Sequence, residues 1–339
     1  MQLADFDFPF DASLIAKHPN RPRDLARLLV VPRKGGAFSD HRILDLPDLL
    51  KPGDVIVVND TKVLPVRLLG LKQPGGGKVE VVLVRQAGDD LWEVFIKGKV
   101  KAGQRMALSG DVQATVVERG NERTVIKVDV QDSWDSWLDR IGQMPLPPYI
   151  KREPTEEDRD DYQTMFARVK GAIAAPTAGL HFTPRVLQAL ETRGICLATV
   201  TLHVGPGTFR PVTAANIEEH RMEPEWYQIP QQTAEVLKQV RETGGRVIAV
   251  GTTVARSLES AANASGEVCP TQGETDLFIT PGFPFRVVDI LLTNFHLPGT
   301  TLLMLIGAFA GLEQARLAYE HAVKHRYRFY SYGDAMLIQ

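Results

Sequence analysis

The sequence predicts an α/β protein with a mainly parallel sheet and a small antiparallel β domain inserted into it. Beyond residue 150, segments with helical and strand periodicity alternate, which is typical of βα units around a mainly parallel sheet. Between residues 63 and 130 the pattern changes to short β segments separated by Gly, Asp and Asn turns, which indicates a small antiparallel barrel or sandwich. The 339 residues exceed the size at which a single core usually keeps growing, so two domains are expected.

The first clear strand covers residues 54–59. Its four central residues are apolar and β-branched, as in a strand buried on both faces. The inserted domain follows, with strands predicted at residues 78–84, 91–96, 112–118 and 124–130 and a helix at 133–142. Three prolines within four residues then require an extended chain over 144–150. We therefore expect the inserted domain at residues 63–150, and the α/β domain at residues 1–62 and 151–339, interrupted after its first strand.

The second part of the α/β domain is predicted to alternate helices with strands. Helices are expected at residues 157–166, 184–193, 233–243, 254–264 and 301–310. Strands are expected at residues 195–202, 246–250, 277–279 and 287–293.

Composition excludes several classes of protein. No apolar run reaches the ~18–20 residues that a membrane span needs. Asp5 and Asp7 stand where a signal peptide would carry positive charge, which favours a cytoplasmic protein. The two cysteines, Cys196 and Cys269, are too far apart to indicate a disulfide framework or a cysteine zinc site. The net charge of −2 neither requires nor excludes an RNA partner, because a local basic patch can bind RNA.

Five polar or glycine-rich segments mark the candidate site. They follow predicted strands, at the edge where open α/β sheets bind ligands. They cover residues 175–182, 201–209, 247–259, 292–301 and 326–336.

Each of the first three segments also has a purely structural interpretation. His181 in the first could act as a base, an acid or a donor, and a packed histidine is equally expected. The second, with His203 before a Gly-Pro-Gly turn, is by itself more often a turn alone. In the third, Thr252 or Thr253 could cap a helix whose free amides face an anionic group, or a βα junction that binds nothing. It matches neither a P-loop nor a G-x-G-x-x-G motif.

The last two segments place chemistry near the C-terminus. Asn294 and His296 stand at a predicted strand end before a helix. The fifth segment has three tyrosines and two arginines within seven residues, a mixture that suits base stacking and phosphate contact. The basic run Lys97, Lys99, Lys101 and Arg105 is either a solvated strand edge or a path for an RNA backbone.

Metal and hydrolase chemistry are not indicated. The histidines His181, His203, His220 and His296 lie in separate segments with no H-x-x-x-H or H-x-H pair, so no metal site is expected. A G-x-S-x-G elbow is absent from the sequence, so a Ser-His-Asp hydrolase is not expected either.

Taken together and in order, the five segments resemble the S-adenosylmethionine:tRNA ribosyltransferase-isomerase family of queuosine synthesis. Residues 5–8, 14–16, 57–67, 76–80 and 144–150 add to the resemblance, which covers residues 3–338. It implies a monomeric protein whose α/β domain is interrupted by an antiparallel β-barrel. It also implies transfer and isomerisation of the ribosyl group of S-adenosylmethionine onto 7-aminomethyl-7-deazaguanine at the tRNA wobble position. The products are epoxyqueuosine in the tRNA, adenine and methionine, and no metal or organic cofactor is needed because S-adenosylmethionine is consumed as a co-substrate.

This chemistry suggests roles for particular residues. The sulfonium acidifies the adjacent ribose carbon, and His181 or His203 is the candidate base because histidine titrates near neutral pH. His296 could protonate the departing adenine, and Asp334 could deprotonate the attacking amine. The predicted substrate-binding residues are Thr177, Gly179, Phe182, Gly205, Gly207, Thr208, Phe209, Thr252, Thr253, Arg256, Asn294, Tyr330 and Tyr332.

Two other functions fit parts of the sequence. A methyltransferase could use the same donor, although residues 54–59 are not followed by a glycine-rich nucleotide loop. A non-enzymatic RNA-binding protein would account for the β domain and the tyrosine-rich C-terminal segment, but not for the polar segments at strand ends.

Overall fold

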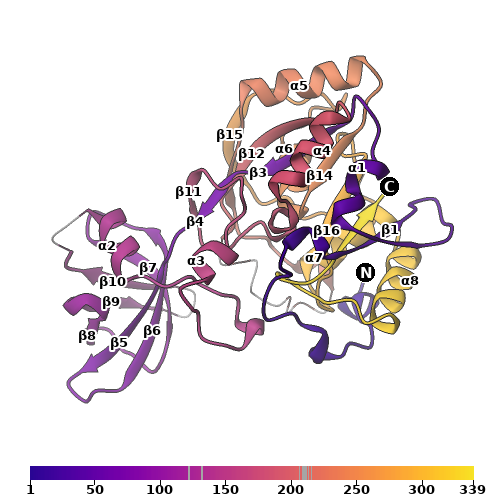
Figure 1. Ribbon diagram of the computed structural model, residues 1–339. Coiled ribbons are helices and arrows are strands. Elements are labelled where there is room, and N and C mark those ends of the chain that lie inside the picture. Colours follow the sequence, from indigo (N-terminus) through magenta and orange to yellow (C-terminus); the bar gives the residue numbers. More distant parts are fainter. Residues whose placement is uncertain (121–122, 131–132, 206, 208–211, 213, 215) are drawn as a thin grey trace.

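The chain folds into a large α/β part and a smaller β-barrel that projects from it (Figure 1). This is a computed structural model, and it describes residues 1–339 apart from 121–122, 131–132, 206, 208–211, 213 and 215. The predicted α/β fold with an inserted antiparallel β domain is confirmed.

The α/β part is built on a nine-stranded sheet. From one edge to the other its strands are β15 (Thr271–Thr275), β13 (Glu225–Ile229), β12 (Cys196–Leu202), β3 (Val55–Asn59), β14 (Val247–Val250), β16 (Ile290–Asn294), β17 (Ala335–Ile338), β1 (Arg27–Val31) and β2 (Ser39–Arg42). The four central strands β12, β3, β14 and β16 are parallel. The sheet as a whole is mixed, because β13 and β15 at one side and β17 and β2 at the other form antiparallel pairs.

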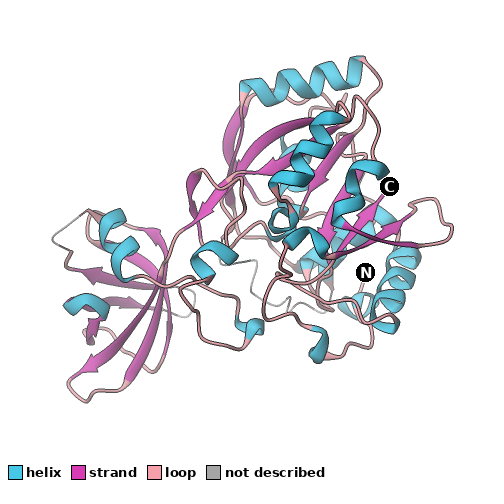
Figure 2. Cartoon of the chain, in the orientation of Figure 1, coloured by secondary structure: helices cyan, strands magenta, loops and turns pink. Residues whose placement is uncertain are grey.

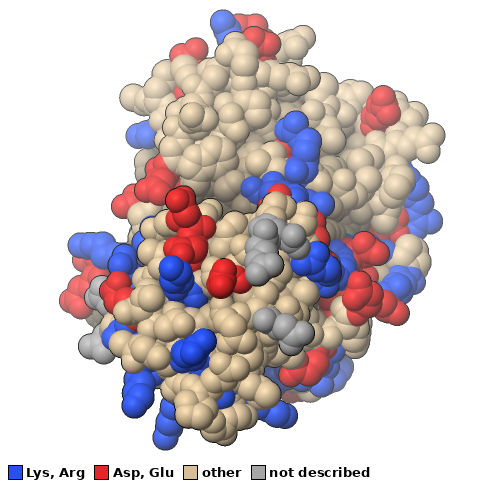
Figure 3. Space-filling model, turned by 90° about the vertical axis from the view of Figure 1, so that its left-hand side faces the viewer, with Lys and Arg blue, Asp and Glu red and all other residues tan. Residues whose placement is uncertain are grey.

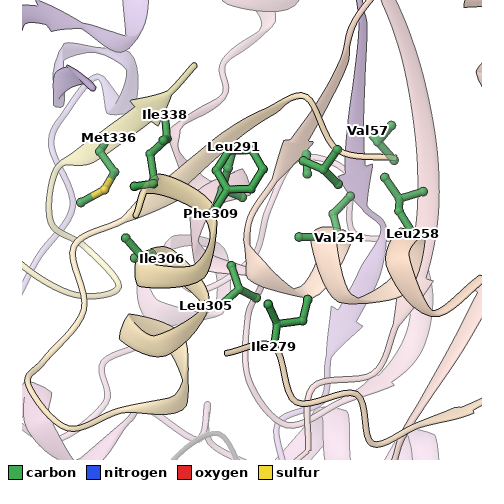
Figure 4. Close-up of a cluster of buried hydrophobic side chains, with 14 of the residues drawn as sticks. Val57, Val254, Leu258, Ile279, Leu291, Leu305, Ile306, Phe309, Met336 and Ile338 are labelled. Atoms are coloured by element: carbon green, nitrogen blue, oxygen red, sulfur yellow. The ribbon is translucent and has the colours of Figure 1, made fainter. Parts of the chain in front are cut away.

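Helices cover both faces of this sheet (Figure 2). All residues of β3, β14 and β16 are buried, as expected for parallel strands with a helix layer on each side. The helices are α1 (Leu46–Leu49), α4 (Pro184–Thr192), α5 (Gln231–Glu242), α6 (Thr252–Ala261), α7 (Thr301–Ala310) and α8 (Leu312–Lys324). Side chains of β3 alternate, so Val55 and Val57 join one apolar core while Ile56 and Val58 join the other. Figure 4 shows the first core, in which the labelled side chains of α6 and α7 surround those of β3, β16 and β17.

The inserted domain is a closed six-stranded barrel whose neighbours are all antiparallel. Its strands are β5 (Arg67–Gln73), β6 (Lys78–Gln86), β7 (Leu91–Lys97), β8 (Arg105–Leu108), β9 (Val112–Arg119) and β10 (Thr124–Val128), followed by α2 (Trp134–Ile141). The structure therefore decides between the predicted barrel and sandwich in favour of the barrel. Strands β5 and β8 were not predicted. Gly70 interrupts the pattern of β5, and a Cβ there would stand 2.7 Å from the Ala107 carbonyl oxygen of β8, so the glycine lets these strands approach.

Two short strands connect the parts. The chain leaves the α/β part through β4 (Thr61–Val63) and returns through β11 (Val169–Ala172), and these strands pair in parallel. The predicted boundary at residues 62 and 63 falls inside β4. The prediction that the insertion follows the first strand was wrong, because β1 and β2 precede β3 in the chain.

Three predictions of local structure differ from the observed chain. The stretch 144–150, predicted to be extended, ends in a short 3-10 helix over Pro148–Ile150. Instead of a helix over 157–166 there is a single turn, α3 (Asp158–Asp161). The Gln163 side chain bonds both the amide and the carbonyl of Val63 at 3.1 and 2.8 Å, which draws the chain toward β4 after this turn. No strand forms at 277–279. The Leu277 carbonyl there accepts a hydrogen bond from Arg256 Nε at 3.0 Å, and the strand lies earlier, at β15.

Among the described helices, none by itself is long and apolar enough to cross a membrane, and α7 with α8 would qualify only as a pair bent by 115°.

Candidate active site

A cavity lies where the carboxyl ends of β14 and β16 meet the residues before β17. The space between its walls, open solvent included, is about 1000 Å³. Since β17 is antiparallel to β16, its beginning lies at the same edge of the sheet as the end of β16. The lining comprises residues 149, 162, 174–178, 204, 222, 251–253, 256, 277–279, 293, 294, 296, 300–302, 305, 330 and 331. All five segments identified in the sequence contribute to it.

Seven of the predicted site residues line the cavity. They are Thr177, Thr252, Thr253, Arg256, Asn294, His296 and Tyr330. Helix α6 begins at the cavity edge because Gly251, with φ of +91°, turns the chain sharply out of β14.

Asn294 presents a buried acceptor at this site. Its Nδ2 donates to the Tyr330 carbonyl at 2.9 Å, which fixes the side-chain amide. Its Oδ1 is buried and faces the His181 side chain, and among the described residues it accepts no hydrogen bond of normal geometry. A buried acceptor without a partner costs free energy, so a donor on a ligand would be favourable there.

His181 lies behind the cavity wall. The residue is 4% exposed, and its Nε2 is a second buried atom without a described partner. Burial, together with the positive charges of Arg328 and Arg23, lowers its pKa to about 4, while the Asn294 side chain acts in the opposite direction. His181 is therefore neutral at physiological pH and adjoins the wall through Asn294.

His296 is the predicted histidine that lines the cavity. Its Nε2 lies 3.1 Å from Thr293 Oγ1, and its backbone amide donates to the Tyr319 hydroxyl at 3.0 Å. Burial lowers its pKa to about 3. The ring is thus held in place and uncharged at neutral pH.

The two buried histidines predict an acid-dependent loss of stability. Their folded pKa values lie below the usual 6.5, so the unfolded chain takes up protons first as pH falls. The stability that the neutral rings allow near pH 7 is therefore lost from pH 6.5 down to about 4 for His181 and to about 3 for His296. The free energy of unfolding should fall by about 2 kcal/mol per histidine between pH 7 and pH 5. Urea unfolding at both pH values measures this fall. In a His181→Gln variant the fall should be smaller by about 2 kcal/mol, and an unchanged fall would contradict the assignment of His181 as a buried neutral group.

His203 points away from the cavity. The next residue after His203, Val204, lines the cavity. In an extended chain the side chains of successive residues point to opposite sides, so the His203 side chain faces away from the cavity. The His203 ring stacks on Trp226 with centroids 4.9 Å apart, and its Nδ1 lies 2.8 Å from Thr61 Oγ1. Burial lowers its pKa, against the influence of the Asp60 carboxylate. His203 therefore belongs to a cluster at the junction with the barrel.

Asp334 has its carboxylate bound to backbone. Oδ1 accepts from the Arg27 amide at 3.0 Å and Oδ2 from the Arg328 amide at 2.7 Å. Burial raises its pKa, while the hydrogen bonds and the neighbouring arginines lower it. Asp334 thus organises the loop before β17, and it is not among the described lining residues.

Arg256 and Glu225 form a buried ion pair beside the cavity. The side chains are 7% and 5% exposed, and Arg256 Nη1 contacts Glu225 Oε2. The remaining carboxylate oxygen of Glu225 accepts from the Gly205 amide at 2.8 Å. Arg256 also donates to the carbonyls of Leu277 and Thr275. One ion pair thereby joins α6, β13, the Gly205 turn and the chain beyond β15.

The other predicted residues have structural contacts. A Cβ on Gly179 would stand 3.0 Å from the Thr164 methyl group, so a larger residue there would require Thr164 to shift. Phe182 packs edge-on against Phe166 in the second core. The Tyr332 hydroxyl donates to Asp158 at 3.1 Å. Gly205 and Gly207 are described but do not line the cavity, while Thr208 and Phe209 lie outside the described residues.

Three comparisons bear on the family. A family model described as queuosine biosynthesis protein matches residues 3–338. A Citrifermentans bemidjiense protein named S-adenosylmethionine:tRNA ribosyltransferase-isomerase is 50% identical over the full length of both chains. A Stenotrophomonas maltophilia protein of the same name is 49% identical over all of this chain and 98% of its own. This chain belongs to the S-adenosylmethionine:tRNA ribosyltransferase-isomerase family.

The predicted family is thereby confirmed. A crystal structure of an S-adenosylmethionine tRNA ribosyltransferase from Thermotoga maritima matches 99% of this chain and all of its own, with 36% identity and a TM-score of 0.58. The ribosyltransferase-isomerase fold therefore extends over the whole chain, barrel included.

Several residues that line the cavity were not predicted from the sequence, above all Tyr149 and Tyr162. The Tyr149 and Tyr330 ring centroids lie 3.7 Å apart, and Tyr149 Oη is 2.7 Å from Ser331 Oγ. Burial raises the pKa of all three tyrosines, so they remain protonated. Tyr149 lies in the proline-rich stretch 144–150, which was predicted only to be an extended chain, and its place in the family resemblance was the available signal. Met222, Phe278, Ile279, Thr300 and Thr301 were also missed.

Among the described residues, no three His, Cys, Asp or Glu side chains come together as a metal site would require.

Proposed function

We propose that this chain transfers and isomerises the ribosyl group of S-adenosylmethionine onto 7-aminomethyl-7-deazaguanine at the wobble position of tRNA. Epoxyqueuosine in the tRNA, adenine and methionine are the products. The observation that carries this proposal is the convergence of all five family segments on one cavity at the carboxyl edge of the sheet. We further propose that the chain acts as a monomer in the cytoplasm; light scattering of the purified protein tests the first point.

The cavity suits a cationic donor that must stay reactive. Aromatic rings of Tyr149, Tyr330 and Phe278 lie in its wall, and ring faces attract cations such as a sulfonium. None of the described lining residues is a carboxylate, and Arg256 is already paired with Glu225. The sulfonium would therefore bind without a counter-ion, and its positive charge would remain available to acidify the adjacent ribose carbon.

We propose His296 as the histidine that exchanges protons with the substrate. It lines the cavity, and its lowered pKa leaves one ring nitrogen unprotonated at neutral pH. A base there would take the proton next to the sulfur, and the imidazolium so formed could return it to the departing adenine. This differs from the sequence-based assignment of the base to His181 or His203. We now propose that these two position Asn294 and Thr61, respectively.

The hydroxyls and the amide would orient the substrate. Thr177, Thr252, Thr253 and Thr301 surround the cavity with hydroxyl groups. Asn294 Oδ1 is a buried acceptor that fits an amino group such as that of adenine. Enclosure by these walls limits water while the sugar passes through several steps.

The deciding experiment uses purified protein, S-adenosylmethionine and tRNA that carries 7-aminomethyl-7-deazaguanine. Free adenine and epoxyqueuosine in the digested tRNA are the expected products. S-adenosylhomocysteine in place of adenine would indicate a methyltransferase. Binding of the tRNA without any product, by folded protein, would indicate an RNA-binding protein instead.

Tyr149 should contribute to binding of the sulfonium through its ring. A Tyr149→Ala variant is expected to weaken S-adenosylmethionine binding by about 3- to 30-fold, the range of a partly desolvated cation–π contact. Tyr149→Phe keeps the ring and loses only the hydroxyl that contacts Ser331, so it should bind nearly as the parent does. Calorimetric titration measures both. Equal weakening in the two variants would assign the effect to the hydroxyl.

A further inference from the structure

A second cavity lies between the outer face of the barrel and the segment that leaves the barrel. The space between its walls, open solvent included, is about 1700 Å³. One wall comes from three adjacent strands: Arg67 on β5, Glu80 and Val82 on β6, and Phe95 and Lys97 on β7. Register explains why these side chains share a face, because Glu80 pairs with Lys97, and Val82 pairs with both Phe95 and Arg67. The other wall comprises residues 145–148, 151–154 and 173. We call this second cavity the barrel groove.

The barrel groove adjoins the candidate active site along two segments. Pro148 lines the groove and the next residue, Tyr149, lines the active-site cavity. Ile173 lines the groove and the next residue, Ala174, lines the active-site cavity. The two cavities therefore share these two backbone segments as a common wall, and a chain molecule in the groove would lie beside the active site.

Charge in the barrel groove favours an anionic ligand. Four basic and two acidic side chains line it. The two acids, Glu80 and Glu153, both pair with Arg67, at 3.0 and 2.7 Å. Arg152 pairs with Asp158 at 2.6 Å. Within the described part of the chain, the exposed residues Lys97 and Lys151 form no ion pair, although Lys97 stands opposite Glu80 and its charge acts on that carboxylate.

A strained backbone position and an exposed aromatic side chain also indicate that the barrel groove binds a ligand. Lys151 has φ of +49°, a conformation that costs free energy for a non-glycine residue and is concentrated at functional sites. Phe95 is 38% exposed although it is a large apolar side chain. Figure 3 shows that Lys, Arg, Asp and Glu are mixed over the barrel side of the molecule. The visible barrel surface as a whole is therefore not uniformly basic.

We propose that the barrel groove binds the single-stranded nucleotides next to the modified base of the tRNA anticodon loop. Lys97 and Lys151 contact their phosphates, and Phe95 stacks on a base. Single-stranded RNA fits better than a duplex, because only unstacked bases offer a face to an aromatic ring. This inference rests on the proposed function, since it assumes that tRNA is the second substrate. Of the basic run in the sequence, only Lys97 lines the groove.

The test compares tRNA binding by charge-reversal variants over a range of salt concentrations. The probe is tRNA carrying 7-aminomethyl-7-deazaguanine. A Lys97→Glu/Lys151→Glu variant should bind it about 10- to 100-fold more weakly, and its plot of log affinity against log salt should be shallower by about 1.4, or ~0.7 per lost phosphate contact. Its S-adenosylmethionine affinity should not change, because neither lysine lines the active-site cavity. A Phe95→Ala variant should weaken binding by about 5- to 100-fold with the salt slope preserved.

A matched control carries the same charge change elsewhere. Lys34 and Lys238 are exposed, and they lie in the β1–β2 turn and in α5, both in the α/β part and outside the barrel (Figure 1). A Lys34→Glu/Lys238→Glu variant should bind the tRNA with the parent slope. Thermal unfolding and S-adenosylmethionine binding confirm that each variant is folded.

The outcomes separate this inference from the proposed function. If the parent protein binds the tRNA and releases adenine while the Lys97→Glu/Lys151→Glu variant behaves identically, the inference is wrong and the proposed function stands. If the parent protein neither binds the tRNA nor releases adenine, both fail. If duplex RNA or an acidic peptide competes as well as an unmodified anticodon stem-loop does, the groove serves another partner and the inference is overturned.

Discussion

Replacement of Arg256 by methionine is expected to lower the free energy of unfolding by about 3–5 kcal/mol. Arg256 and Glu225 are both more than nine-tenths buried, so loss of the guanidinium leaves a carboxylate in a dry site without its partner. The carbonyls of Leu277 and Thr275 lose their donors at the same time. Chemical denaturation of the parent and the variant measures the difference.

A second substitution separates the ion pair from the volume of the side chain. In Arg256→Met/Glu225→Gln no buried charge remains, and the glutamine oxygen can still accept from the Gly205 amide. The double variant should therefore recover more than half of the lost stability. The surface offers a matched control: Arg316 pairs with Glu313 while both are at least half exposed, so Arg316→Met should cost less than about 1 kcal/mol. Equal losses at Arg256 and Arg316 would contradict the role given to burial.

The Arg256→Met variant should also affect the substrate site. Arg256 joins α6 to β13 through its ion pair with Glu225, and Glu225 in turn holds the Gly205 turn. Thr252 and Thr253, which line the cavity, lie at the start of α6. We expect a higher KM for S-adenosylmethionine in Arg256→Met at a temperature where the protein is still folded. Recovery of stability without recovery of KM in the double variant would show that the guanidinium itself contacts the substrate.

The fold was largely predictable because elements buried on both faces have nearly uninterrupted apolar sequences. Strands β3 and β14 appear as short apolar runs, and α7 occupies the residues predicted for it, because its uniformly apolar pattern belongs to a helix buried nearly all round. The direction of β17 was not predictable. Nothing local in residues 335–338 distinguishes a parallel from an antiparallel partner, and that choice decides that the Tyr330 segment meets the end of β16.

The site was predictable in its segments but not in its side-chain directions. Sequence analysis selected His203, yet in an extended chain only one of His203 and Val204 can face the cavity, and the structure turns Val204 inward. The partner of Arg256 is 31 residues away along the chain, so only the fold reveals the ion pair. Tyr149 reaches the cavity from the chain leaving the barrel, a route that becomes evident only after the barrel is placed.

Replacement of His296 by glutamine is expected to lower kcat by about 10²–10⁴-fold, the usual contribution of a positioned proton-transfer group. Glutamine approximates the size of the ring and can still bond Thr293, but it cannot carry a proton between substrate atoms. S-adenosylmethionine affinity should change little, so the loss should fall on kcat and not on KM. The rate of adenine release in a single turnover, by enzyme that already holds its substrates, measures this loss.

The dependence on pH distinguishes His296 from the other histidines. Burial holds its pKa near 3, so it stays unprotonated as pH falls, and kcat/KM should show no acid limb from this group above about pH 5. A base at His203, which lies outside the cavity and is less buried, would give a limb closer to the usual 6.5. Thr293→Val keeps the imidazole and removes only the hydroxyl beside Nε2, so it should lower kcat by less than His296→Gln does. His181→Gln or His203→Gln could instead lower kcat as far as His296→Gln does while S-adenosylmethionine binding is retained. The proton-transfer role would then belong to that histidine, and the proposal that it only positions its neighbour would be wrong.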